Sequence, residues 1–405
     1  MKQPDHKWEF KSRFRRHAFG WKSQPAITRI KQAVTEIRKV ARYDPVLAAE
    51  GAITFLERVS PALENVDSSS GAIGTAVNNA IAELVPVIAK APAGSEMREA
   101  WLERLWEAYQ DDEIPYIEGL GDHWGELCAS EGAASGWADR LVGLVRQAWS
   151  PDPSLRGFFK GTSNCLSALV ASQRYDDALA LLEIAPYKMW DYRQYGVKAL
   201  AALGRKAEAI RYAEEGRGLS DSSIAIARAC EGILLSSGLV DEAYHRYALA
   251  ANQAGTYLAT FRAVGKKYPH KRASDILSDL VKTTPGDEGK WFAAAKEAGL
   301  YDEALALASR TPCDPRTLAR AARDYAESQP AFAVGAGLLA LHWLVQGYGY
   351  EITGADVWAA YASTMKAAER HGSATEVKER IRTLVTSEGC GGRFVTEILG
   401  RELGP

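Results

Sequence analysis

The sequence predicts an all-α fold in which antiparallel helical hairpins stack into an α-solenoid. The first observation is a phrase that recurs between Asn164 and Arg310: an apolar helix, a short turn, then Asp or Glu beside an alanine. The second is the spacing of these alanines, which lie 31, 34 and 61 residues apart, and the last interval spans a degenerate copy near Ala273. They are Ala178, Ala209, Ala243 and Ala304. A period of this length predicts stacked helical hairpins. The third is the scarcity of alternating β-branched runs, which argues against an appreciable sheet.

Residues 1–25 are predicted to form a basic arm rich in aromatic residues. As far as Asp44 the chain holds twelve Lys or Arg against four Asp or Glu, whereas the rest holds 37 against 47. One interpretation is a nucleic-acid contact, in which cations neutralise phosphates and aromatic rings stack on unpaired bases. The residues proposed for it are Lys11, Arg13, Arg15, Arg16, Trp21 and Lys22. The alternatives are an arm that packs its aromatic side chains on its own body or on a second subunit, and attachment to a membrane surface.

Residues 26–155 are predicted to form an N-terminal helical module. Ile30, Val34 and Ile37 recur at three and four residues, which is the spacing of a helix with one buried face. Asp44 and Pro45 are typical of the N-cap and the first position of a second helix. The residues from Asp67 to Gly71 are then expected to cap a third helix over 72–89.

An acidic cluster near residue 111 is the strongest candidate in the chain for a metal or acid–base site. Its members are Asp111, Asp112, His123 and Glu126. His123 and Glu126 would share a helix face, and a carboxylate from Asp111 or Asp112 would complete a metal or acid–base set. The alternative is a solvated turn and a helix-capping histidine. Because a second histidine at metal-ligand spacing is missing, the sequence predicts neither a metal nor a cofactor.

Residues 156–405 are predicted to hold the repeats and a C-terminal cap. Gly204, Gly238 and Gly299 stand where one helix ends and the chain reverses, which favours the left-handed conformation that glycine adopts without strain. The acidic residues that follow suit the first turn of the next helix. Each repeating alanine is expected where the two helices of a hairpin cross, so a larger side chain there would push them apart.

An aromatic segment, residues 186–195, lies between the first two copies. It contains the residues proposed for partner binding, which are Tyr187, Trp190, Tyr192, Arg193 and Tyr195. Tyr, Trp and Arg are enriched at the hot spots of protein interfaces, so a concave surface would present them to a peptide. The alternative is packing between repeats.

Two stretches of the array resemble a known repeat. The order Gly-Leu-Tyr-Asp-Glu-Ala in Gly299–Ala304 resembles the centre of tetratricopeptide repeats, and Tyr175–Ala178 keeps its second half. The resemblance implies a right-handed superhelix of hairpins. Pro186 and Pro312 follow two of the alanines closely, which predicts shorter second helices than in a standard repeat.

From Asp44 onward the chain also resembles an uncharacterised bacterial all-helical family known as a domain of unknown function. The features that carry this resemblance are residues 65–71 and the Leu-x-x-x-Gly-x-x-x-Glu-Ala hairpins. The stretch from Ala359 to Leu399 is similar to the tail of SWIM zinc-finger proteins, although the sequence lacks the zinc finger itself. The family implies a fold and no activity.

Cysteine usage and hydropathy predict a cytoplasmic protein that does not associate with membranes. The five cysteines are far apart, which suits reduced core thiols. They are Cys128, Cys165, Cys230, Cys313 and Cys390. The first ten residues are charged and polar, unlike a secretory signal, and the apolar run from Ala331 to Val345 is too short to span a bilayer.

These observations predict a non-enzymatic scaffold that binds a protein partner along a concave face. Nucleic-acid binding through the basic arm is the alternative, and catalysis centred on residues 111–126 is the third hypothesis. The sequence shows no nucleophile beside a base and no nucleotide-binding loop. It does not predict an oligomeric state.

Overall fold

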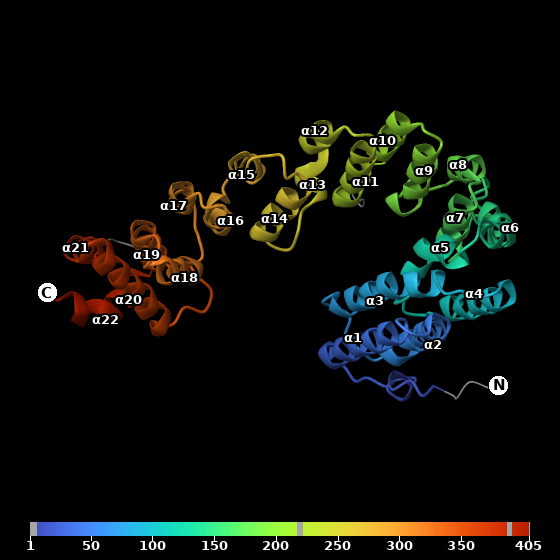
Figure 1. The fold of residues 1–405 in the computed structure, drawn as a ribbon, viewed down its shortest axis with the longest axis horizontal. Coiled ribbons are helices and arrows are strands. Elements are labelled where there is room, and N and C mark those ends of the chain that lie inside the picture. Colours follow the sequence, from blue (N-terminus) through green and yellow to red (C-terminus); the bar gives the residue numbers. More distant parts are fainter. Residues whose placement is uncertain (1–5, 217–221, 387–390, 405) are drawn as a thin grey trace. The chain divides into compact units, whose positions relative to one another are not determined.

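A computed structural model describes residues 6–216, 222–386 and 391–404, and every regular element within them is helical (Figure 1). The prediction of an all-α fold is therefore confirmed. By its internal contacts the chain divides into two compact units, unit 1 (Met1–Ile233) and unit 2 (Leu234–Pro405). The arrangement of the hairpins as a superhelix stays a prediction, and so do the sequence-based boundaries near residues 25 and 155.

Unit 1 opens with three long helices that share one core. They are α1 (Ser23–Val40), α2 (Pro45–Leu63) and α3 (Ala72–Ala89), and the short 3-10 helix η1 (Phe10–Ser12) precedes them. As predicted, the Asp44 carboxylate caps α2 by accepting a hydrogen bond from the Leu47 backbone N–H at 2.9 Å. The residues up to Gly71 cap α3 as predicted: Gly71 is the N-cap, in the left-handed conformation with φ 69°, and Ser70 Oγ accepts a hydrogen bond from the Ala72 backbone N–H at 3.4 Å.

The apolar character of α3 comes from its place in this core. By length and composition α3 could cross a membrane, and it is the one helix among the described residues that passes this test. Its side chains Ile81, Leu84 and Val85 are buried, and the helix packs against α1, α2 and α5. A helix that is buried in a protein core is also rich in apolar residues, so it meets the same criterion of length and composition.

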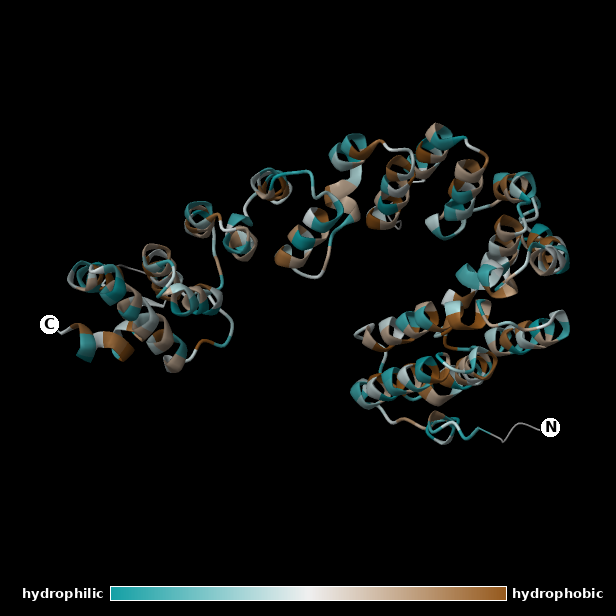
Figure 2. Ribbon diagram, in the orientation of Figure 1, coloured by the Kyte–Doolittle hydropathy of each residue, from teal (hydrophilic) through white to brown (hydrophobic). Residues whose placement is uncertain are grey.

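Within the described residues, the remainder of unit 1 is a run of eight further helices that follow α3. They are α4 (Ser95–Gln110), η2 (Glu118–His123), α5 (Trp124–Cys128), α6 (Glu131–Ala148), α7 (Thr162–Ala171), α8 (Tyr175–Glu183), α9 (Trp190–Ala202) and α10 (Lys206–Glu215). α11 (Ser223–Ser236) crosses the boundary between the units. Three indole rings anchor the middle of unit 1, since Trp106 lies 5.8 Å from Trp124 and 5.7 Å from Trp137 between ring centroids. Figure 2 shows apolar residues gathered on the sides of these helices that face one another.

Unit 2 continues the succession of helices. They are α12 (Val240–Ala243), the π-helix η3 (Tyr244–Ala248), α13 (Leu249–Ala251), α14 (Tyr257–Lys267), α15 (Ala273–Lys282), η4 (Glu288–Trp291), α16 (Phe292–Glu297), α17 (Tyr301–Arg310), α18 (Pro315–Tyr325), α19 (Pro330–Val345), α20 (Gly354–His371), α21 (Ala374–Val385) and α22 (Gly392–Leu403). In the C-terminal helix α22, Val395 and Leu399 are buried, whereas Phe394 is 41% exposed.

Five helical hairpins share one turn geometry. In each, the residue before the second helix donates its backbone N–H to the carbonyl five residues earlier, which is the long hydrogen bond of a Schellman motif. These bonds run from Arg174 to Leu169, Arg205 to Leu200, Leu239 to Leu234, Leu300 to Ala295 and Ser373 to Ala368, at 2.9–3.0 Å. Glycine occupies the left-handed position in four of the turns, and Gln173 occupies it in the first, with φ 58°.

The four repeating alanines are buried, and their place at the helix crossings stays a prediction. Ala178, Ala209, Ala243 and Ala304 are each 0% exposed. The degenerate copy differs, because Ala273 is exposed at the start of α15 and Ile276 is buried in its place. The described cysteines Cys128, Cys165, Cys230 and Cys313 are buried, and Cys390 lies outside the described residues.

Candidate functional site

The aromatic segment presents mainly one of its five proposed side chains to solvent. Tyr187 is 65% exposed, whereas Trp190, Arg193 and Tyr195 are 9%, 5% and 1% exposed. Tyr192 is half-buried, and its ring meets Trp149 edge to face at 5.3 Å. The reason is the start of α9 at Trp190, which turns the later residues of the segment toward neighbouring helices.

Two of these buried residues join α9 to other elements. The Arg193 guanidinium lies 3.8 Å from the centroid of the Tyr212 ring and donates a hydrogen bond to the Tyr212 carbonyl. The Tyr195 hydroxyl donates to Asp122 Oδ1 at 2.6 Å, and burial raises the pKa of this phenol well above its ordinary value. Both contacts stabilise the packing of unit 1. Partner binding by the segment stays a prediction, for which Tyr187 is the accessible residue.

The acidic cluster is divided between the interior and the surface. Asp112 is 4% exposed, and its carboxylate accepts hydrogen bonds from Ser60 Oγ and, at 2.9 Å, from the Ile117 backbone N–H. Burial raises the pKa of Asp112. His123 and Glu126 remain at the surface, 3.5 Å apart between Nδ1 and Oε2. Within the described residues, no group of three or more His, Cys, Asp or Glu is placed to hold a metal.

The basic arm turns its cations outward. All five cations proposed for nucleic acid, Lys11, Arg13, Arg15, Arg16 and Lys22, have exposed side chains, and Trp21 is 72% exposed. The other large aromatic residues of the arm follow the self-packing alternative. Trp8, Phe10 and Phe14 are buried at 7%, 2% and 1% exposure, and Phe19 is partly buried against the same core.

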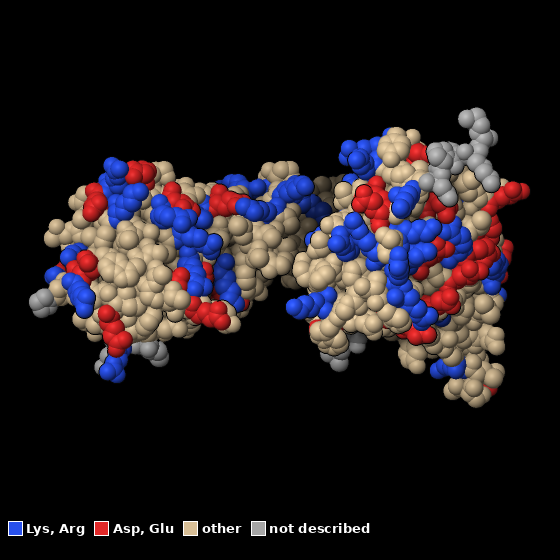
Figure 3. Space-filling view, turned by 90° about the horizontal axis from the view of Figure 1, so that it is seen from below, with Lys and Arg blue, Asp and Glu red and all other residues tan. Residues whose placement is uncertain are grey.

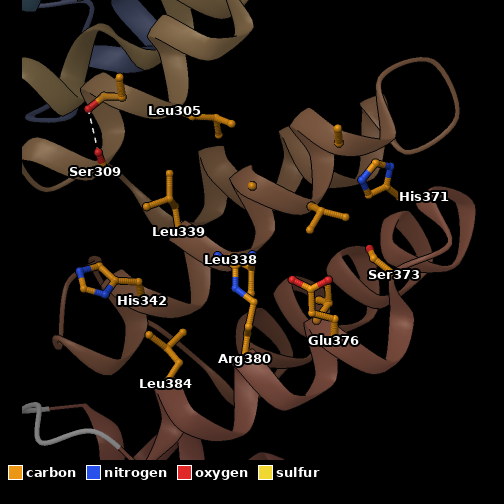
Figure 4. A pocket seen from close by; sticks show the side chains of 15 residues that line it. Leu305, Ser309, Leu338, Leu339, His342, His371, Ser373, Glu376, Arg380 and Leu384 are labelled. Carbon is orange, nitrogen blue, oxygen red and sulfur yellow. Dashed lines mark hydrogen bonds between the residues drawn. The ribbon is translucent and has the colours of Figure 1, made fainter.

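A groove that no motif indicated lies in unit 2 between α17, α19 and α21, and we call it the α17–α21 groove. Its volume is about 580 Å³, and Figure 4 shows its side chains converging from the three helices. The larger apolar lining residues are Leu305, Val334, Leu338, Leu339, Val377 and Leu384. Leu305, Leu338 and Leu339 are each only half-buried, so apolar surface remains open to solvent here.

Close helix packing places this apolar lining. A Cβ at Gly335 of α19 would lie 2.6 Å from Leu305 Cδ1, so the absence of a side chain lets α17 approach. The Trp343 indole N–H donates to the Ala308 carbonyl at 2.8 Å, which fixes α19 against α17. The floor of the groove is therefore preformed.

Four polar residues with ionisable side chains also line the groove. They are His342, His371, Glu376 and Arg380. Glu376 and Arg380 are exposed one turn apart on α21, and among the described residues neither makes an ion pair. Burial lowers the pKa of His342, so this imidazole is neutral at pH 7. An apolar floor beside charged side chains is the composition of many binding surfaces.

Sequence reasoning missed this groove because its residues come from helices that are separated in the sequence. The available signal was α19, which carries apolar residues on every side. Such a helix is expected to be buried all round. Its half-exposed Leu338 and Leu339 mark the place where no further helix of unit 2 covers it within the described residues.

No protein-family model matches the chain, and no curated protein matches it. The resemblances to tetratricopeptide repeats, to the uncharacterised helical family and to the SWIM-associated tail stay predictions.

Proposed function

We propose that the protein is a non-enzymatic scaffold, an α-solenoid of tetratricopeptide-like hairpins that binds a partner protein. The shared turn geometry and the burial of the repeating alanines support the repeat architecture. The observation that carries the binding role is the α17–α21 groove, where half-exposed leucines from two helices line one preformed apolar floor.

The occupant that fits this groove best is an amphipathic helix of the partner. Such a helix places apolar side chains at every third or fourth position into an apolar groove and keeps its charged side in water. The Arg380 guanidinium has no acidic partner among the described residues, so a carboxylate flanking the apolar stripe gains a charge-assisted hydrogen bond.

Affinity capture with a matched pair of variants tests the proposal. Leu339→Glu places a charge on the groove floor, and Leu155→Glu makes the same change at a leucine of unit 1 that is 65% exposed. We expect a helical partner segment to be captured by the wild-type protein and by Leu155→Glu, and to be lost with Leu339→Glu. Circular dichroism of both variants checks that the fold persists.

Cross-linking locates the bound segment. Cross-links from the captured partner to α19 and α21 are expected. A partner that Leu339→Glu retains in full excludes the groove as its site, and repeated capture of no partner argues against the scaffold.

Tyr187→Ala tests the aromatic segment separately, because this side chain is exposed and its removal leaves the packing of α9 intact.

A further inference from the structure

The basic arm is held on unit 1 by its own backbone and aromatic side chains. Phe10 and Phe14 meet Phe55 of α2 edge to face, with ring centroids 5.8 and 5.1 Å apart. The Glu36 carboxylate of α1 accepts the backbone N–H groups of Glu9 at 2.8 Å and Phe10 at 3.2 Å. Because these contacts fix the path of the arm, its cations form a permanent part of the surface.

This surface has a large excess of uncompensated positive charge. Between Lys7 and Arg42 eleven Lys or Arg are described, and all have exposed side chains. Three pair with carboxylates, namely Arg13 with Glu9, Arg16 with Glu64 and Arg38 with Glu83. The other eight make no ion pair within the described part of the chain, and they are Lys7, Lys11, Arg15, Lys22, Arg29, Lys31, Lys39 and Arg42. Figure 3 shows Lys and Arg gathered on this side of unit 1, bordered by acidic groups.

A groove of about 640 Å³ between η1 and α1 concentrates part of this charge. Its cations are Arg13, Arg29, Lys31 and Lys39. Its two carboxylates are already engaged, since Glu36 holds the arm and Glu9 lies 3.5 Å from Arg13. Hydroxyl and amide groups of Thr28, Gln32 and Thr35 also line it. The groove therefore combines positive charge with hydrogen-bonding groups, which suits a chain of phosphates.

Two exposed aromatic side chains flank the helix that forms one wall of this groove. Trp21 precedes α1 and is 72% exposed, and Tyr43 follows α1 and is 66% exposed. The outward face of α1 between them is polar, with Gln24, Thr28 and Thr35 exposed. A membrane-bound helix would instead present a broad apolar face. Separate exposed rings beside cations are the arrangement on which unpaired bases stack.

We infer that unit 1 binds single-stranded nucleic acid. The phosphates follow the groove between η1 and α1, where Arg29, Lys31 and Lys39 neutralise them, and a base stacks on Trp21. These contacts are to phosphates and to the face of a base, so we expect binding that does not depend on sequence. The site is separate from the α17–α21 groove and does not depend on the scaffold role.

Fluorescence anisotropy with labelled oligo-dT and oligo-U, measured across a salt series, tests the inference. We expect binding that weakens as salt rises, with a logarithmic slope of about −2 for three phosphates neutralised on a single strand. Lys31→Glu with Lys39→Glu removes two of the free cations, and we expect at least about a tenfold loss of affinity. Lys188→Glu with Lys266→Glu changes the net charge equally at exposed residues elsewhere and should leave binding near the wild-type value.

Trp21→Ala separates stacking from charge. We expect it to weaken single-strand binding by about five- to 150-fold while the salt slope stays unchanged, because stacking carries no charge. Tyr350→Ala, at a residue that is 80% exposed in unit 2, is the matched aromatic control. Thermal melting shows whether each variant keeps the wild-type stability.

Several results would overturn the inference. These are equal binding to polyglutamate, to phosphatidylserine vesicles or to duplex DNA of the same length, and an equal loss of affinity in the control variants. A signal that does not depend on salt would also exclude it.

Discussion

Asp112 shows how a single residue in a charged run can serve the fold. Its neighbour Asp111 is exposed, whereas Asp112 turns inward and receives hydrogen bonds from Ser60 and from the backbone of Tyr116 and Ile117. The two residues are chemically identical, and only the path of the chain after α4 distinguishes them. The sequence predicted the acidic cluster and could not tell which member is buried, because the donors lie up to 52 residues away.

Replacing Asp112 with alanine should destabilise unit 1. The change leaves the hydroxyl of Ser60 and two backbone N–H groups without their acceptor, so we expect the free energy of unfolding to fall by about 2 to 4 kcal/mol. Urea unfolding followed by circular dichroism measures it. Asp111→Ala is the control and should shift the free energy by no more than about 0.5 kcal/mol. Equal effects of the two variants would contradict the structural role of Asp112.

His342 makes the stability of unit 2 depend on pH. Burial lowers its pKa below the ordinary value of 6.5, so the folded state binds fewer protons than the unfolded chain as the pH falls through that value. Its contribution is complete above pH 6.5 and is lost progressively below it. We expect His342→Gln to lose less stability than the wild-type protein between pH 7.5 and pH 5 in urea titrations. Parallel curves for the two proteins would contradict this.

At the scale of the element, each hairpin depends on one left-handed residue. Four turns use glycine, and the first uses Gln173, a residue for which this conformation is strained. We therefore expect Gln173→Gly to raise the free energy of unfolding by up to about 1 kcal/mol, and Gly299→Gln to lower it by about 1 to 2 kcal/mol. Thermal and urea unfolding measure both changes. Shifts of the same sign would mean that backbone strain does not govern these turns.

The crossing alanines give a second test at this scale. Ala209 is 0% exposed, so Ala209→Leu must separate α9 from α10, at a cost of about 1 to 3 kcal/mol. Ala207, two residues earlier on α10, is exposed and provides the control, since Ala207→Leu adds the same atoms without a clash. Comparable destabilisation by both variants would show that α10 packs through a different face.

The hairpin turns could be predicted from the sequence because the residues that specify each turn are close together in the chain. A turn glycine, an acidic first turn and a small crossing residue fall within six positions, so the phrase around Ala304 or Ala243 determines its own hairpin. Near Ala273 the phrase is degraded, and there Ile276 is buried where the other copies have an alanine. Tertiary contacts between helices, such as Leu305 of α17 against Gly335 of α19, leave no local pattern and were found only in the structure.

At the scale of the whole molecule, two compact units imply two cooperative bodies. Hydrogen exchange on Asp112→Ala tests this, because the substitution lies in unit 1. We expect amide exchange to accelerate in residues 6–216 and to stay at the wild-type rate in residues 240–386. An equal acceleration in both ranges would mean that the units unfold as one.

The charge distribution was also visible at this scale from the sequence. The excess of cations before Asp44 predicted a basic arm, and the structure places these cations at the surface of unit 1. Composition could not show that Trp8, Phe10 and Phe14 turn inward while Trp21 stays outside. That difference depends on Phe55 of α2, which lies some forty residues away along the chain.

The buried thiols allow the rate of local opening to be measured. Burial raises the pKa of Cys128, Cys165 and Cys313 to about 12, so almost no thiolate exists at neutral pH while the surrounding helices stay closed. An alkylating reagent can therefore reach each sulfur only during a transient opening. The rate of alkylation at each of these three cysteines therefore measures how often the surrounding helices open, and no probe has to be introduced.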